Sequence, residues 1–127
     1  YLNRGGFLFA ESCCGRPGFD AGFRRAMAQV LNGAELLPIP TEHPIYQFPN
    51  AVGEVEPRLP LARELKTENL ISPGLQGISI DGRLAVVYSP YGLACGWELA
   101  ECPYCHGIVA RDALALGVNV LTYALLQ

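Results

Sequence analysis

Five cysteines and two histidines are the residues of this chain best suited to metal binding or nucleophilic chemistry. Two of the thiols stand close together in Cys102-Pro103-Tyr104-Cys105-His106, where an imidazole follows the second thiol directly. This spacing suits three chemistries: one half of a zinc site, a redox-active dithiol, and the covalent attachment of a c-type haem. The other thiols, Cys13, Cys14 and Cys95, join this motif only if the fold brings distant segments together.

A tetrahedral zinc site needs four ligands, and the motif supplies two of them. We predict that thiols from two other segments complete the site, which gives the ligand set Cys14, Cys95, Cys102 and Cys105. Cys13 is expected to point away, because neighbouring side chains diverge in an extended chain. His106 replaces Cys14 in this hypothesis if Cys14 does not reach the other thiols.

Two other uses of the same thiols stay open. A disulfide from Cys14 or Cys95 to one thiol of the motif is expected if the protein is exported, and five cysteines then leave one thiol over. Haem attached to Cys102 and Cys105 beside His106 would need a pocket wrapped around the macrocycle. An α/β domain of 127 residues has little room for such a pocket.

The hydrophobic pattern predicts the elements that hold these residues. Phe7–Ala10 is apolar at every position, which predicts a strand buried on both faces at the centre of a parallel sheet. A helix with an apolar face is expected over Asp20–Leu31, capped by Asp20 and followed by a crossover to a neighbouring strand. Strand, loop and helix in this order form half of a βαβ unit.

The second half of the chain carries the clearest strand signal. Residues 75–80 and 83–89 flank Asp81-Gly82, which predicts a hairpin with a type I′ turn. Residues 111–126 predict a helix so apolar that several of its sides should be buried, with Asn119 satisfying a buried polar partner. We therefore expect a three-layer α/β fold with a mainly parallel sheet and a hairpin at its edge.

The fold also predicts where a ligand would bind. In open α/β sheets, ligands bind beyond the carboxyl ends of the strands. The loops that follow Phe9 and Tyr88 are therefore expected to share one rim. The candidate ligand-binding residues of this rim are Glu11, Ser12, Arg16, His43, Tyr91 and Trp97. Trp97 is also expected to anchor its loop over the core.

The composition argues against some classes of protein. In this chain 50% of the residues are hydrophobic and 17% are charged, as in a packed domain rather than a disordered chain. The net charge is −3 and the Lys and Arg residues are scattered, so we expect no nucleic-acid partner. No apolar run reaches the roughly 18 residues of a membrane span.

The length fits a single α/β domain over residues 1–127. Tyr1–Gly6 has the pattern of a helix end, with an apolar pair, a cation in the last turn and a glycine after it. We therefore expect that this domain lacks its first strand–helix unit.

Five segments, which span nearly the whole chain, resemble in their order a bacterial family known as domain of unknown function 4159 (DUF4159). They are Tyr1–Leu8, Phe19–Arg24, His43–Tyr46, Asp81–Val86 and Gly117–Ala124. The family is similar in fold to class I glutamine amidotransferases, so the resemblance implies a flavodoxin-like sheet between helix layers. It also implies a place within larger, envelope-associated bacterial proteins, whose other domains would be the partners of this one. The family has no established activity.

Catalytic members of that superfamily carry a cysteine on the sharp turn after a strand, which would be Cys13 or Cys14 here. The resemblance therefore implies a cysteine-dependent amidase or hydrolase as one candidate, with His106 as the base. Glu11 and Ser12 stand where a small residue is expected before the nucleophile, and no carboxylate lies two residues after the histidine. We favour a non-catalytic ligand- or protein-binding module of an envelope protein, with a cysteine-rich loop stapled by zinc or a disulfide.

Overall fold

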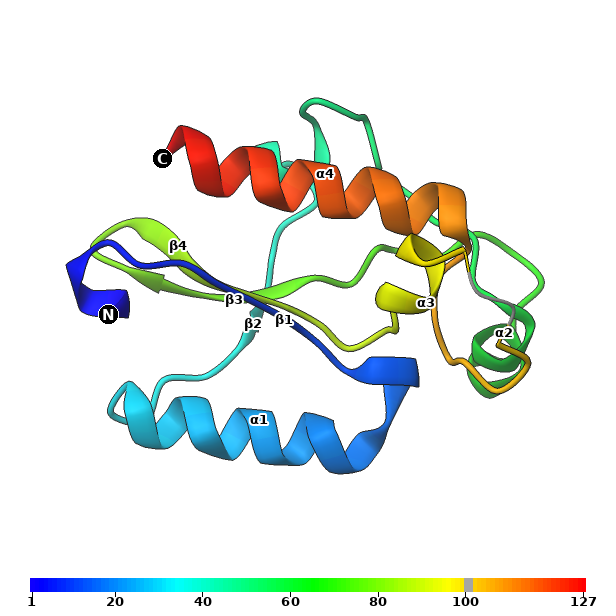
Figure 1. Ribbon diagram of the computed structural model, residues 1–127, viewed down its shortest axis with the longest axis horizontal. Coiled ribbons are helices and arrows are strands. Elements are labelled where there is room, and N and C mark those ends of the chain that lie inside the picture. The colour runs from blue at the N-terminus through cyan, green and yellow to red at the C-terminus, as the bar shows by residue number, and fades with distance from the viewer. Residues whose placement is uncertain (100–101) are drawn as a thin grey trace.

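A mixed sheet of four strands lies between two layers of helix (Figure 1). The computed structural model describes residues 1–99 and 102–127. The strands are β1 (Leu8–Glu11), β2 (Leu37–Pro38), β3 (Gln76–Ile80) and β4 (Arg83–Ser89), in the spatial order β1-β4-β3-β2. The helices are α1 (Pro17–Val30), α2 (Leu59–Leu65), α3 (Ala94–Trp97) and α4 (Ala110–Leu126), and single 3₁₀ turns cover Leu2–Arg4, Cys13–Gly15 and Pro44–Tyr46. The predicted α/β class is confirmed.

β3 and β4 form the hairpin that the sequence predicted. Asp81 and Gly82 join the two strands with φ values of 52° and 79°, the positive angles that a type I′ turn requires at both central residues. β1 pairs with the far side of β4, and β2 pairs with the far side of β3. The predicted place of the hairpin at the sheet edge is therefore wrong, because each of its strands has a second neighbour.

β1 is the strand whose position the sequence mispredicted. It pairs in parallel with β4, in a register that sets Glu11 opposite Ser89, and all its residues are half-buried. Within the residues that the structure describes, β1 has no other partner, and its pair with β4 is the one parallel pair. The expectation of a mainly parallel sheet with Phe7–Ala10 at its centre is therefore wrong. Helices on both sides partly cover this edge strand, and such cover favours the same apolar sequence as a central position.

The segment after β1 also differs from its prediction. α1 begins at Pro17, where proline suits the first helical position, and Asp20 is not its cap. The Asp20 carboxylate instead lies 2.9 Å from Arg24 Nε and accepts a hydrogen bond from the Tyr88 hydroxyl at 2.7 Å. After α1 the chain crosses to β2 at the opposite edge of the sheet, rather than to a strand beside β1.

Successive residues of β4 face the two helix layers, because side chains alternate along a strand. Val87 packs in the core beneath α4, together with Leu116 of that helix. Val86 and Tyr88 pack in the core above α1, together with Met27. Figure 1 shows the two helices on opposite faces of the sheet, which is the three-layer arrangement expected from the sequence.

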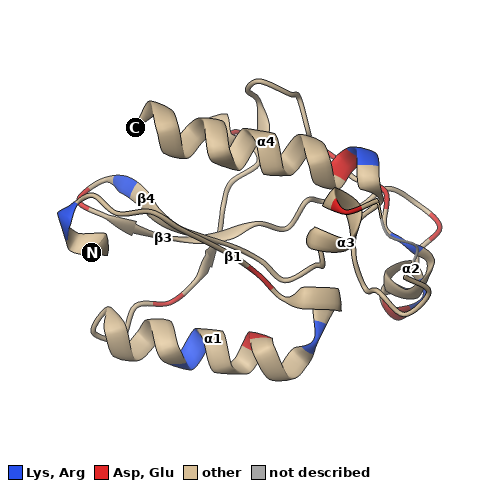
Figure 2. Ribbon diagram, viewed as in Figure 1, with Lys and Arg blue, Asp and Glu red and all other residues tan. Residues whose placement is uncertain are grey.

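α4 is less buried than its sequence predicted. Its charged residues, Arg111 and Asp112, lie in the first turn, and the rest of the helix carries no charge (Figure 2). One side of α4 packs on the sheet, but the neighbouring side leaves a partly exposed apolar row, formed by Leu114, Val118, Leu121 and Leu125. The prediction that several sides are buried is wrong for this face. No helix among the described residues is long and apolar enough to cross a membrane.

A single buried side chain fixes the proline-rich segment between β2 and α2 to α4. Asn119 is fully buried. Its Nδ2 donates to the carbonyl oxygens of Ile45 at 2.9 Å and Asn50 at 2.8 Å. Its Oδ1 accepts from the backbone N–H of Asn50 at 3.0 Å and from the Asn50 side chain at 3.2 Å. The prediction that Asn119 satisfies a buried polar partner is confirmed.

Replacement of Asn119 by alanine should lower the free energy of unfolding by about 2–4 kcal/mol. The reason is that buried backbone groups lose their hydrogen-bond partner, and each group left unsatisfied costs about 1–3 kcal/mol. Val118→Ala is the matched control, since Val118 is the adjacent residue on the exposed side of the same helix. We expect this control to cost less than about 1 kcal/mol. Urea unfolding followed by circular dichroism measures both variants, and equal losses would contradict the role assigned to Asn119.

Candidate metal centre

The parallel pair of β1 and β4 brings the loops that follow these strands to one end of the sheet. The pairing continues past the strands, because Ser12 N–H donates to the Ser89 carbonyl at 2.9 Å. Figure 1 shows the turn after β1 and the short helix α3 side by side at this end. A parallel bridge between Gly92 and Gly107 adds the segment before α4 to the same place. The prediction that the two loops share one rim is confirmed.

Four thiols meet on this rim. The Sγ atoms of Cys14, Cys95, Cys102 and Cys105 all lie within 4.8 Å of one another. The Sγ atoms of Cys14 and Cys95 are 3.8 Å apart. Cys105 is fully buried, and the other members of this four-thiol cluster are half-buried. The convergence of distant segments that the sequence analysis expected is therefore present in the fold.

Cys14 reaches the cluster through a tight turn at the end of β1. Its backbone adopts the left-handed conformation, with φ 57° and ψ 18°, and Gly15 follows with φ 70°. A Cβ on Gly15 would lie 2.7 Å from the carbonyl oxygen of His106, so only glycine fits there. His106 N–H donates to the Cys14 carbonyl at 3.1 Å. The backbone on both sides of the cluster therefore holds Cys14 in place.

The Glu11 side chain, which was predicted to be one of the ligand-binding residues of the rim, positions Cys95. The Glu11 carboxylate accepts hydrogen bonds from the backbone N–H groups of Leu93 and Ala94, the latter at 3.2 Å. These groups stand at the start of α3, where N–H groups have no partner within the helix. Glu11 thus ties the end of β1 to the helix turn that carries Cys95.

Cys102 and Cys105 lie at the two ends of a β-turn. The turn is closed by a hydrogen bond from Cys105 N–H to the Cys102 carbonyl at 3.3 Å, and Pro103 occupies the second position, where its fixed φ is favourable. The backbone N–H of Tyr104 bonds to the Cys102 thiol and lowers the pKa of this thiol below its usual value. A donor of this kind favours the thiolate that a metal ion requires.

Cys105 lies in a narrow space between two glycines. A Cβ on Gly92 or on Gly107 would lie 3.1 Å from Cys105 Sγ. Burial raises the pKa of the Cys105 thiol strongly, and hydrogen bonds with Cys95 and Cys14 raise it further. In the absence of a cation this thiol therefore stays protonated. Such close backbone packing also leaves no room beside Cys105 for the haem that the motif suggested.

The spacing of the cluster fits a tetrahedral metal ion. Zinc–sulfur bonds of about 2.3 Å place two sulfur ligands about 3.8 Å apart. The distance between Cys14 Sγ and Cys95 Sγ is 3.8 Å. A disulfide holds its sulfurs at about 2.05 Å, so either sulfur would have to move considerably to form one.

Cys13 stays outside the four-thiol cluster, as expected, but the reason given for this expectation is wrong. Its Sγ lies 3.9 Å from Cys14 Sγ, although it is not one of the four converging thiols. The expectation assumed extended backbone, in which neighbouring side chains diverge. The chain forms a 3₁₀ turn here instead, and the left-handed Cys14 brings both side chains to the same side.

The geometry disfavours Cys14 as a nucleophile activated by His106. The ring Nδ1 of His106 lies 2.7 Å from Glu64 Oε2 in α2, a partner for which the sequence offered no signal. In the described part of the chain, no hydrogen bond joins this ring to a thiol. Burial raises the pKa of the Cys14 thiol, whereas a cysteine nucleophile needs a lowered one.

The other predicted rim residues have separate places. The Ser12 hydroxyl is buried and donates to the Arg16 carbonyl at 2.8 Å, while Arg16 is exposed next to the turn. Tyr91 is half-buried beside Gly74. His43 is not on the rim, because its ring lies 5.2 Å from the tilted ring of Tyr123, about three turns along α4 from the cysteines.

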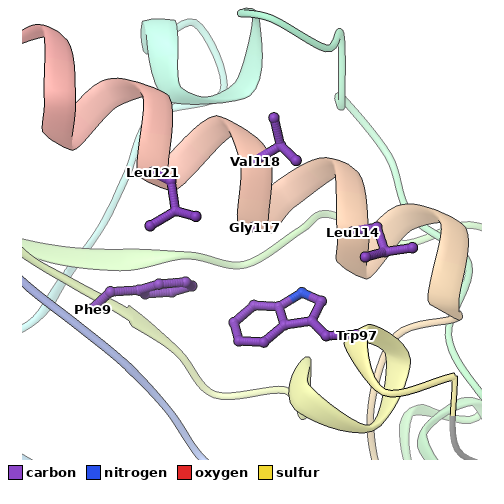
Figure 3. A pocket seen from close by; sticks show the side chains of 6 residues that line it. All are labelled: Phe9, Trp97, Leu114, Gly117, Val118 and Leu121. Carbon is purple, nitrogen blue, oxygen red and sulfur yellow. The ribbon is translucent and has the colours of Figure 1, made fainter.

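Trp97 faces away from the cysteines and towards α4. Its indole N–H donates to the Ala113 carbonyl at 2.7 Å, and its ring lies 5.8 Å from that of Phe9. Figure 3 shows the two rings below α4, in an apolar pocket that is also lined by Leu114, Gly117, Val118 and Leu121. The indole packs directly on Gly117, which explains a glycine inside the helix. Trp97 therefore anchors α3, as one of its two predicted roles required.

The fold and the cluster define a small α/β domain with a thiol-rich candidate metal centre. The model of the family described as Domain of unknown function (DUF4159) matches residues 1–125. The chain belongs to this family, and the resemblance seen in its sequence is confirmed. No curated protein and no solved structure matches it.

The packing around Cys105 generates a test. Gly107→Ala should lower the free energy of unfolding by about 1–3 kcal/mol, because the added methyl overlaps the Gly92 carbonyl and presses on Cys105 Sγ. Gly53→Ala is the matched control, since a Cβ there would have no neighbour within 4 Å. Thermal unfolding and the rate of thiol labelling report stability and access to Cys105. If the two variants behave alike, the close packing described here does not govern the cluster.

Proposed function

We propose that this domain binds one zinc ion through Cys14, Cys95, Cys102 and Cys105, and that the ion has a structural role. The observation that carries the proposal is the approach of these four Sγ atoms to within 4.8 Å of one another. They come from the end of β1, from α3 and from the turn before α4, which are far apart in sequence. Four sulfur ligands with no open position are typical of structural zinc sites.

The chemistry of the ligand set favours zinc over harder cations. Thiolates bind zinc and other soft or borderline ions, whereas magnesium and calcium take oxygen ligands. Binding would release the protons of thiols such as Cys105, whose pKa burial raises in the metal-free protein. Burial destabilises the thiolate form of Cys105 in the metal-free protein. The positive charge of a bound dication would offset this destabilisation.

The bound ion would act as a cross-link. The described residues between β4 and α4 form one short helix, α3, and otherwise irregular backbone. A metal ion that joins α3 and the Cys102–Cys105 turn to the end of β1 would hold this segment against the sheet. Because α3 carries Trp97, the same ion would fix the indole that closes the apolar pocket below α4.

On this basis we infer a binding module rather than a thiol enzyme. The candidate nucleophile Cys14 has its Sγ 3.8 Å from Cys95 Sγ, which is the spacing of two sulfur ligands on one zinc ion. The His106 imidazole is paired with Glu64. The family resemblance supports a place in a larger, envelope-associated bacterial protein, with other domains of that protein as partners. The shared rim at the ends of β1 and β4 is where such a module would present its ligand surface.

Metal analysis of the purified chain tests the zinc site. The wild type should contain one zinc ion per chain, and Cys14→Ser, Cys95→Ser, Cys102→Ser and Cys105→Ser should each lose most of it, because three ligands remain. Cys13→Ser is the matched control, since Cys13 is adjacent to a ligand but outside the cluster, and it should keep the metal. Cobalt substitution should give the thiolate charge-transfer and tetrahedral bands of a four-sulfur site.

Chelation provides a second readout. Trp97 is the single tryptophan of the chain and lies two residues after Cys95, so its fluorescence should change when a chelator removes the ion. The free energy of unfolding should fall at the same time, because the ion binds the folded state. A wild type without metal, or a set of two disulfides revealed by a free-thiol count, would overturn the zinc proposal.

A further inference from the structure

A fifth thiol stands beside the cluster at the spacing of a metal ligand. Cys13 Sγ is 3.9 Å from Cys14 Sγ, and Cys14 Sγ is 3.8 Å from Cys95 Sγ. Two sulfurs on one tetrahedral zinc ion are about 3.8 Å apart. Cys14 therefore has two neighbouring thiols at the spacing of zinc ligands: Cys95, which belongs to the cluster, and Cys13, which does not.

Exposure falls from this outer thiol towards the centre of the cluster. Cys13 is exposed, Cys14 and Cys95 are half-buried, and Cys105 has no exposed surface. A cation that comes from solvent along this side would therefore meet Cys13 first, and would reach Cys105 only after passing the half-buried thiols. The left-handed turn at Cys14 creates this path, because it sets two adjacent thiols on one side of the chain.

The other approach to the cluster is less favourable for a cation. Cys102 is half-buried beside a groove whose charged lining residues are two arginines, Arg58 and Arg63, and one glutamate, Glu56. At Cys13 the charged neighbours are Glu11 and Arg16, whose charges have opposite sign. The lining of the groove carries an excess of one positive charge, which opposes a dication, whereas the charges near Cys13 largely cancel.

We propose that Cys13 is the exchange thiol of this centre, through which zinc enters and leaves the cluster. This inference rests on the proposed zinc site. On arrival, bonds form from zinc to the sulfurs of Cys13 and Cys14 while bonds to water or to a thiolate donor break. The two thiol protons pass to the departing ligands or to water. The other three cysteines then bind as the two remaining water or donor ligands leave and as the bond to Cys13 breaks. The three thiols give their protons to water or to the departing ligands, and the Cys13 thiolate takes up a proton from water. No electrons are transferred.

The test compares rates with equilibrium content. Wild type and Cys13→Ser are loaded with zinc, and transfer of the metal to a chromogenic chelator is followed. We expect Cys13→Ser to slow the transfer about tenfold, the low end of the effect that loss of a partner outside the ligand set has on metal sites. Zinc content and the cobalt spectrum should be unchanged. Cys13→His, which restores a ligand atom, should recover part of the rate.

Leu59→Ser is the control for a general disturbance of the surface. Leu59 is 60% exposed and lines the groove on the Cys102 side, so the rate of this variant should equal that of the wild type. Equal rates for wild type and Cys13→Ser would overturn the exchange role and leave the zinc site intact. Loss of zinc from Cys13→Ser would also overturn it, because Cys13 would then be a resident ligand. A wild type that binds no zinc would overturn the site and the inference together.

Discussion

The parallel pairing of β1 with β4 is the constraint on which the rest of this structure depends. It sets Glu11 opposite Ser89, so that the turn after β1 and the loop after β4 leave the sheet at the same end. Antiparallel pairing would send Cys14 to the opposite end of the sheet from Cys95. Glu11 then secures the arrangement, because its carboxylate binds the first N–H groups of α3. One short strand pair thus decides that distant thiols meet.

The sequence predicted the features that depend on local chemistry or on a general rule of sheets. The turn at Asp81-Gly82 requires positive φ at both residues, and this preference alone locates the hairpin. The convergence of Cys14 with the later thiols followed from the rule that parallel strands end on one side. Asn119, a polar residue inside an apolar helix, indicated a buried partner without saying which one.

The errors arose where one sequence pattern fits two structures. An apolar run such as Phe7–Ala10 suits a central strand and equally an edge strand covered by helices, so composition did not reveal the edge. The approach of Cys13 to Cys14 depends on a left-handed residue that is not glycine, which no local preference announces. Glu64 became the partner of His106 through tertiary packing alone. Such contacts belong to the fold and not to any short segment.

The distance in sequence between the thiols sets an order of events during synthesis on the ribosome. Cys14 is made roughly 90 residues before Cys105, which corresponds to about 5–20 s of translation. For most of this interval β1 lacks its partner β4, and the pair Cys13-Cys14 is carried on a nascent chain without a completed site. The four-thiol cluster can close only when the last third of the chain has emerged. Products of interrupted translation would therefore contain the first thiols but never the assembled centre.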